Sequence, residues 1–144
     1  MKINSHNEWD KLREVILGSA DKQSAVLTWD KKDPIPLKNL EKAQSLSKDA
    51  YPQWLLDEVN EDLDDVRKIF EKFGVKVHRP KVYDINKMYV SPYGWSSTGN
   101  NIYNVRDLHL IVGNNVIESS SPIKNRYFEA TALYNIWYKY FLVS

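Results

Sequence analysis

The sequence predicts an α/β fold in which strands and helices alternate along one domain, residues 1–144. Two groups of elements support this prediction. A strand, an amphipathic helix and a second strand are expected in the first part of the chain, and a β-hairpin and an aromatic helix in the second. A chain of 144 residues is also long enough to bury a core of its own.

The first strand is predicted at residues 12–18, LREVILG, where β-branched residues precede a glycine. Residues 19–49 have a mixed composition, and the DPIP run at residues 33–36 forbids regular helix. We therefore expect a long irregular excursion after the first strand.

The clearest helix covers residues 51–74, with Pro52 in its first turn and Gly74 at its end. Its apolar residues recur every three or four positions: Leu55, Val59, Leu63, Val66, Phe70 and Phe73. The alternating VKVHRP segment at residues 75–80 then predicts a second strand. Strand, helix and strand together form one α/β unit.

Residues 81–101 are predicted to form a loop, because Tyr, Asn, Ser, Pro and Gly occur there without alternation or helical spacing. Its expected anchors are aromatic: Tyr83, Tyr89, Tyr93 and Trp95. The segments LHLIVG and NVIESS follow, on either side of a Gly-Asn-Asn turn that begins at Gly113. These turn residues tolerate positive φ angles, so a β-hairpin is expected.

The last predicted element is a helix at residues 125–141, NRYFEATALYNIWYKYF. Its aromatic stripe is typical of a core face, and it consists of Phe128, Leu133, Ile136, Trp137 and Tyr140. A helix this apolar is expected to be covered by a further layer. Because the sequence stops directly after it, we expect either a fragment of a larger protein or a homodimer.

Composition argues against several classes of protein. The 20 basic and 19 acidic residues leave no strong net charge to attract nucleic acid or a membrane surface. No apolar run is long enough to span a bilayer, and the polar start MKINSHNEWD has no signal-peptide core, so a cytoplasmic protein is expected. There is no cysteine, and the three histidines, His6, His78 and His109, lack metal-ligand spacing. We therefore expect no metal and no cofactor.

Asp107 is the candidate functional residue, because it precedes residues 108–112, a run that is expected to be largely buried. A carboxylate beside a core needs a partner. That partner is either Arg106 or another basic side chain, in a structural ion pair, or a cationic ligand in a cleft. A guanidinium ion would suit the second case, because its planar pair of N–H groups matches a carboxylate.

Four motifs in order resemble the N-terminal part of the glycine and inosamine-phosphate amidinotransferases: NEWDKLREVILG, GVKVHRP, STGNNIYNVRDLHLIVGNNVIES and NRYFE. The resemblance runs from Asn7 to about Phe141. These enzymes belong to the guanidino-group-modifying (pentein) superfamily, whose fold is a five-bladed α/β propeller of ββαβ modules. The resemblance implies that this chain is a partial propeller of about two modules with mixed sheets and packed helices.

The resemblance also implies site residues. The aspartate of the family's Pro-Arg-Asp tripeptide binds the guanidino group of the arginine donor, and it falls on Asp107, although Val105 replaces the proline here. Ser97, Thr98 and Gly99, together with Arg106, would then lie at the mouth of the active site. Arg126 and Glu129 belong to a motif interpreted as structural, with loop and helix-surface positions as the alternative.

The chemistry implied by the resemblance is transfer of an amidino group from arginine, or another guanidino compound, to an amine through a covalent cysteine intermediate. The family's cysteine and histidine lie in its C-terminal part. Because this chain has no cysteine, we expect no catalytic residue in it and no activity from it alone. Two alternatives stay open: a non-catalytic binding or assembly module, and a fragment of a related guanidine deiminase.

Overall fold

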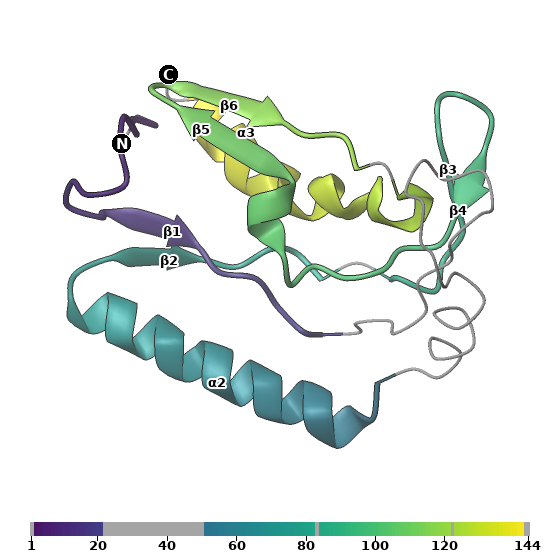
Figure 1. Cartoon of the computed structure of the whole chain (residues 1–144), viewed down its shortest axis with the longest axis horizontal. Coiled ribbons are helices and arrows are strands. Elements are labelled where there is room, and N and C mark those ends of the chain that lie inside the picture. Colours follow the sequence, from purple (N-terminus) through teal and green to yellow (C-terminus); the bar gives the residue numbers. More distant parts are fainter. Residues whose placement is uncertain (1, 22–50, 83, 122, 143–144) are drawn as a thin grey trace, which may run out of the picture.

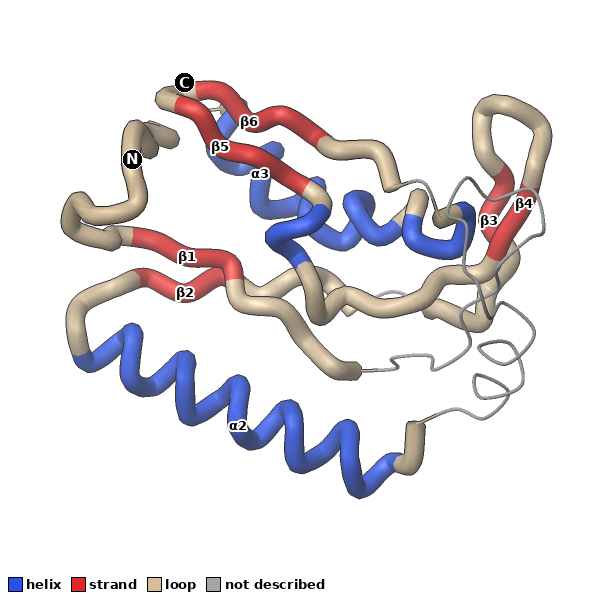
Figure 2. Tube along the Cα trace, viewed as in Figure 1, coloured by secondary structure: helices blue, strands red, loops and turns tan. Residues whose placement is uncertain are grey.

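The computed structural model describes residues 2–21, 51–82, 84–121 and 123–142. These residues form three small two-stranded sheets and two α-helices, joined by long loops and 3-10 turns (Figures 1 and 2). Most of the irregular excursion expected at residues 19–49 lies outside the described residues, as does Tyr83. None of the helices in the described part of the chain is both long and apolar enough to cross a membrane.

The strand–helix–strand unit predicted from the sequence is confirmed. β1 (Glu14–Ile16) pairs in parallel with β2 (Lys76–His78), and Glu14 lies opposite Lys76 in the register. Between them in the chain comes α2 (Gln53–Lys72), which lies along one side of this pair (Figure 1). The chain leaves α2 through Gly74, whose φ of 74° suits a residue without a Cβ.

Residues 81–101 contain a short hairpin, where the sequence predicted only loop. β3 (Tyr89–Val90) pairs with β4 (Ser96–Ser97) in antiparallel fashion, and Gly94 turns the chain with a φ of 81°. Two residues per strand are too few to produce a visible alternation, which explains the missed hairpin. The rings of Tyr89 and Trp95 do act as anchors, since both contact Phe128.

The hairpin predicted around Gly113 is confirmed as β5 (His109–Val112) and β6 (Asn115–Glu118). The expected burial of its first strand is wrong. Leu108 is buried, but residues 110–112 are 37 to 58% exposed. A sheet of only two strands cannot bury both of its faces unless another layer covers each of them.

The C-terminal segment is less regular than the single helix predicted at residues 125–141. It forms 3-10 turns at Lys124–Arg126 and Glu129–Leu133, and only then α3 (Tyr134–Phe141). The hydroxyl of Thr131 donates to the carbonyl oxygen of Phe128 at 2.6 Å, a local bond that competes with helical pairing.

The core lies where this segment meets the hairpin and β1. Leu108, Leu133 and Ile136 are buried together there. Half-buried side chains pack around them from several elements: Ile16, Val105, Trp137 and Tyr140. The core therefore joins the first α/β unit to the second, and it fixes the 3-10 turn that carries Asp107.

Candidate functional site

Asp107 lies at the end of a 3-10 turn, Val105–Asp107, immediately before β5. The turn is closed by the Asp107 N–H, which donates to the carbonyl oxygen of Asn104 at 3.2 Å. The side chain is 55% exposed, and its Oδ2 atom lies 3.1 Å from Nη1 of Arg126. A basic side chain therefore does pair with Asp107, but it comes from 19 residues further along the chain.

Arg106 does not fill that role. Its side chain is almost fully exposed and faces Glu8, with 3.4 Å between Nη2 and Oε1. A pair this open to water contributes little to stability. The Arg106 side chain points away from the Asp107 carboxylate because successive residues of a tight turn project in different directions.

Arg126 connects Asp107 to a second carboxylate, which is buried. Its Nε atom lies 3.0 Å from Oε2 of Glu129, whose side chain is 1% exposed. The other oxygen of Glu129, Oε1, accepts a hydrogen bond from the backbone N–H of Asn101 at 3.2 Å. Glu129 is therefore buried and paired, and its interpretation as a helix-surface residue is wrong.

We call Asp107, Arg126 and Glu129 the Asp–Arg–Glu triad. Burial raises the pKa of Glu129 to about 7, although Arg126 and the N–H of Asn101 act to lower it. Burial acts to lower the pKa of Arg126, but the two carboxylates outweigh it and raise that pKa, so the guanidinium keeps its charge. The triad thus combines one exposed carboxylate with one that water does not reach.

The segment Ser97–Gly99 directly precedes the residues that contact this triad. Ser97 ends β4, Thr98 is half-buried, and Gly99 is buried with its N–H donating to the carbonyl oxygen of Ile85 at 2.8 Å. Two residues later Asn101 bonds to Glu129. Sequence reasoning missed Asn101, since a backbone donor carries no sequence signal.

A second polar cluster joins the two halves of the fold. Oε2 of Glu14 lies 2.7 Å from Nε2 of His78 and 3.1 Å from Nζ of Lys76, and it also accepts a hydrogen bond from the hydroxyl of Tyr140. The hydroxyl oxygen of Tyr140 and Nε2 of His78 are 2.9 Å apart. We call these four residues the Glu14 cluster.

The Glu14 carboxylate is held by these hydrogen bonds in a largely buried position, since its side chain is 14% exposed. Burial acts to raise the pKa of Glu14, but the hydrogen bonds from Tyr140, His78 and Lys76 outweigh it and lower the pKa to about 2. Burial and the bond to Glu14 raise the pKa of Tyr140 above its usual range.

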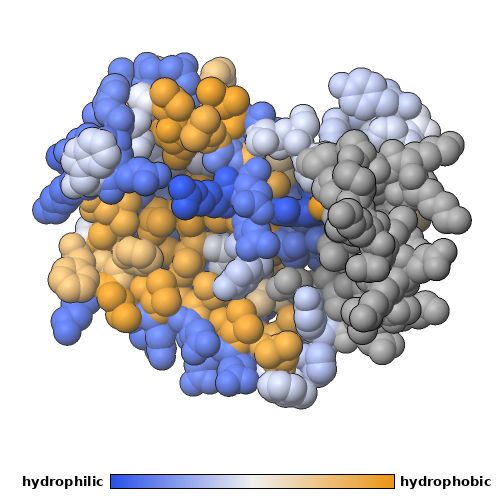
Figure 3. Space-filling model, in the orientation of Figure 1, coloured by the Kyte–Doolittle hydropathy of each residue, from blue (hydrophilic) through white to orange (hydrophobic). Residues whose placement is uncertain are grey.

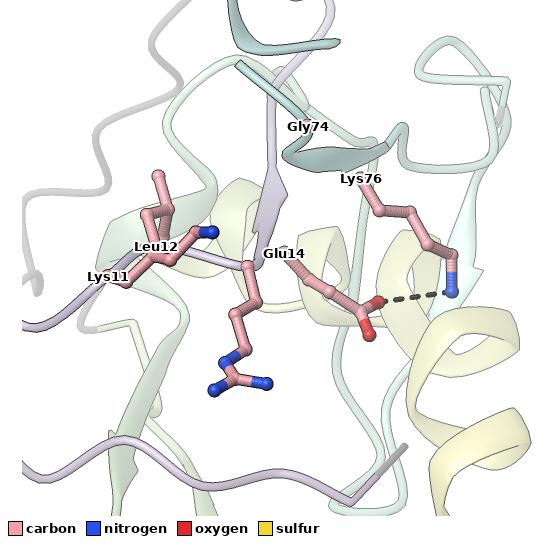
Figure 4. Close-up of a pocket in the computed structure, with 6 residues that line it drawn as sticks. Lys11, Leu12, Glu14, Gly74 and Lys76 are labelled. Carbon is pink, nitrogen blue, oxygen red and sulfur yellow. Dashed lines mark ion pairs between the residues drawn. The ribbon is translucent and has the colours of Figure 1, made fainter.

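An open cavity of about 340 Å³ lies beside this cluster (Figure 4). It is lined by Lys11, Leu12, Arg13, Glu14, Gly74 and Lys76. Figure 4 shows the Lys76 side chain turned toward Glu14, and a dashed line marks the ion pair between them. Within the described ranges, no group of three or more His, Cys, Asp or Glu side chains is arranged to hold a metal ion.

Comparison with known proteins identifies relatives along nearly the whole chain, although no protein-family model matches it. The L-arginine:L-lysine amidinotransferase of Pseudomonas savastanoi pv. phaseolicola is 34% identical over 141 residues, which are 96% of this chain and 38% of that protein. Inosamine-phosphate amidinotransferase 1 of Streptomyces griseus is 32% identical over 142 residues, with 96 and 40% covered.

The fold also resembles solved structures of amidinotransferases. SxtG, an amidinotransferase from Microseira wollei in the saxitoxin biosynthetic pathway, matches with a TM-score of 0.82 and 34% identity, over 99% of this chain and 41% of that one. The inosamine-phosphate amidinotransferase StrB1 of Streptomyces griseus matches with a TM-score of 0.76 and 28% identity, over 97 and 40%. The resemblance predicted from the motifs is confirmed, and the chain spans about 40% of the length of these relatives.

Proposed function

We propose that this chain, a relative of the amidinotransferases over nearly its whole length, forms the part of an amidinotransferase that holds the guanidino group of arginine. The observation that carries the proposal is the match to amidinotransferases over 96% of the chain in sequence and 99% in structure. In this proposal the 144 residues form one domain, arranged as about two modules of a five-bladed propeller.

Asp107 is the proposed guanidino-binding residue. Its carboxylate is more than half exposed, and the bond to Arg126 engages Oδ2. Among the described residues, none donates a hydrogen bond to Oδ1, so this oxygen is open to water or a ligand. A guanidinium ion can donate to such an oxygen in a charge-assisted hydrogen bond, which is stronger than a bond between neutral groups.

The proposed reaction proceeds in two steps. A cysteine thiolate attacks the central carbon of the arginine guanidinium, and the bond from that carbon to the side-chain nitrogen breaks, so that ornithine leaves with a proton. The acceptor amine then attacks the amidino carbon and gives up a proton, and the carbon–sulfur bond breaks to release the thiolate. Because the sequence has no cysteine, the thiolate must come from polypeptide outside these 144 residues, and the chain by itself is expected to be inactive.

Binding of arginine to the purified chain tests the role of Asp107. We expect saturable chemical-shift changes near residues 105–108 in NMR titrations with arginine, and none with citrulline, whose urea group has the same shape but no charge. Asp107→Asn should abolish the response, because it removes the negative charge and keeps the shape. Asp62→Asn, on an exposed position of α2, is the matched control.

Equal arginine binding by the wild type and Asp107→Asn would remove Asp107 from the site, and no response from the wild type would contradict the proposal. The relatives and solved structures named above are all amidinotransferases. That agreement favours amidino transfer over the deiminase alternative.

A non-catalytic assembly module is the second candidate function. Figure 3 shows apolar side chains gathered over the β5–β6 hairpin, and Leu110, Val112 and Ile117 of this hairpin are more than half exposed. The proposed occupant is a second copy of the chain. Sedimentation velocity tests it: a dimer that Leu110→Lys converts to a monomer supports assembly, whereas a monomeric wild type at every concentration excludes it.

A further inference from the structure

We propose that Glu129 acts as a positioning residue that balances the charge of Arg126, so that Asp107 can accept a cationic ligand while it is paired to an arginine. This inference rests on the proposed guanidino-binding role of Asp107. It concerns a buried side chain that would not touch the ligand, and it explains why a ligand-binding carboxylate can have an arginine as its neighbour.

The geometry places Arg126 between two carboxylates. Its Nη1 atom lies 3.1 Å from Oδ2 of Asp107, and its Nε atom lies 3.0 Å from Oε2 of Glu129. The Arg126 side chain is only 15% exposed, and that of Glu129 is 1% exposed. Charges in such a position are screened much less than charges at the surface, so each affects its neighbours strongly.

The sum of the charges decides whether a guanidinium ion is attracted. A ligand guanidinium that approaches Asp107 also approaches Arg126, and the two positive charges repel each other. With Glu129 ionised, the Asp–Arg–Glu triad carries two negative charges and one positive charge, and therefore one net negative charge. With position 129 neutral, the charges of Asp107 and Arg126 cancel, and the attraction for a cation is largely lost.

Burial disfavours the charged form of Glu129, and Arg126 and the N–H of Asn101 only partly offset this effect. The groups that face it in the described structure are the Arg126 guanidinium, the N–H of Asn101 and, beyond Arg126, the Asp107 carboxylate. Because burial alone disfavours a carboxylate, and the pKa of Glu129 is about 7, binding should be measured at about pH 8, where the carboxylate is ionised.

Variants that separate charge from shape test the proposal, with arginine as the ligand and NMR titration as the measurement. Glu129→Gln should weaken arginine binding about tenfold, the effect expected when one nearby unit charge is removed from a partly screened site. The double variant Arg126→Gln/Glu129→Gln should recover most of that loss, because Asp107 then supplies the net negative charge alone. A purely structural role of Glu129 predicts that the double variant binds arginine no better than Glu129→Gln, since it removes both ends of the ion pair.

A second comparison keeps the test valid if Glu129→Gln alone does not fold. Arg126→Lys/Glu129→Gln and Arg126→Gln/Glu129→Gln share the same glutamine and differ in the charge at position 126. The variant with the neutral residue should bind arginine about tenfold more tightly. Amide spectra of each variant establish that it is folded before binding is compared.

Equal affinities in that second comparison, or a double variant that binds no better than Glu129→Gln, would overturn the charge-balance proposal. Asp107→Asn distinguishes this failure from that of the proposed function. If Asp107→Asn abolishes binding while the charge variants all bind alike, only the role of Glu129 is wrong. If Asp107→Asn binds like the wild type, the guanidino-binding role itself is wrong.

Discussion

Protonation of Glu14 is expected to destabilise the fold in acid. Its carboxylate joins β1 to β2 and α3 through Lys76, His78 and Tyr140, and the folded-state pKa is about 2, against an ordinary value of 4.5. A pKa that is lower in the folded state means that folding favours the ionised form. The stabilisation is therefore complete above about pH 4.5 and is lost as the pH falls from there toward 2.

The magnitude follows from the difference between the two pKa values. The pKa of Glu14 falls from 4.5 to about 2 on folding, and a change of one in pKa corresponds to about 1.36 kcal/mol. Glu14 should therefore contribute about 3 kcal/mol to the free energy of unfolding at neutral pH. The Glu14 side chain is 14% exposed, but that of Lys76 is 64% exposed, so water screens the part of this contribution that comes from Lys76.

Urea denaturation of the wild type and Glu14→Gln across this pH range measures the effect. The variant should be less stable than the wild type by about 3 kcal/mol at about pH 6. The difference should shrink to about 0.4 kcal/mol near pH 2, where Glu14 of the folded wild type is about half protonated. Glu58→Gln, on an exposed position of α2, is the control and should show no such trend. A Glu14→Gln deficit that is equally large at both pH values would refute the reasoning.

Three further substitutions test the packing. Tyr140→Phe keeps the ring and removes the hydroxyl that donates to Glu14, so it should lower the free energy of unfolding by about 1.5–3 kcal/mol, whereas Tyr138→Phe at an exposed position should change it by less than about 0.5 kcal/mol; urea denaturation measures both. Gly18→Ala should lower the melting temperature more than Gly74→Ala, because a Cβ at Gly18 would collide with a backbone carbonyl, whereas at Gly74 it meets open space and costs about 1 kcal/mol for the left-handed φ. Equal melting temperatures would contradict that close approach. Leu133→Ala should cost about 2–5 kcal/mol, because Leu133 is fully buried; a loss below about 1 kcal/mol in urea denaturation would contradict its place in the core.

The elements with a clear local pattern could be predicted from the sequence. The helix from residue 51 to 74 and the strand that follows it are found within two residues of the expected bounds, as α2 and β2. Apolar spacing and turn residues are properties of neighbouring positions, so they are visible without a structure. The single helix predicted at the C-terminal end is wrong, because two 3-10 turns precede α3. Within the second part of this segment the hydroxyl of Thr131 donates to the carbonyl oxygen of Phe128, a bond of the kind that competes with regular helix.

The sequence by itself determined the order of these elements and the lack of cysteine in these 144 residues, and it singled out Asp107 as a candidate. Only the tertiary structure decided the partners of the charged residues. Asp107 pairs with Arg126 instead of the adjacent Arg106, and Glu14 meets Tyr140 across 126 positions of the chain. The physical reason is that a charge is stabilised by whatever the fold brings within a few ångströms, and distance along the chain does not limit which group that is.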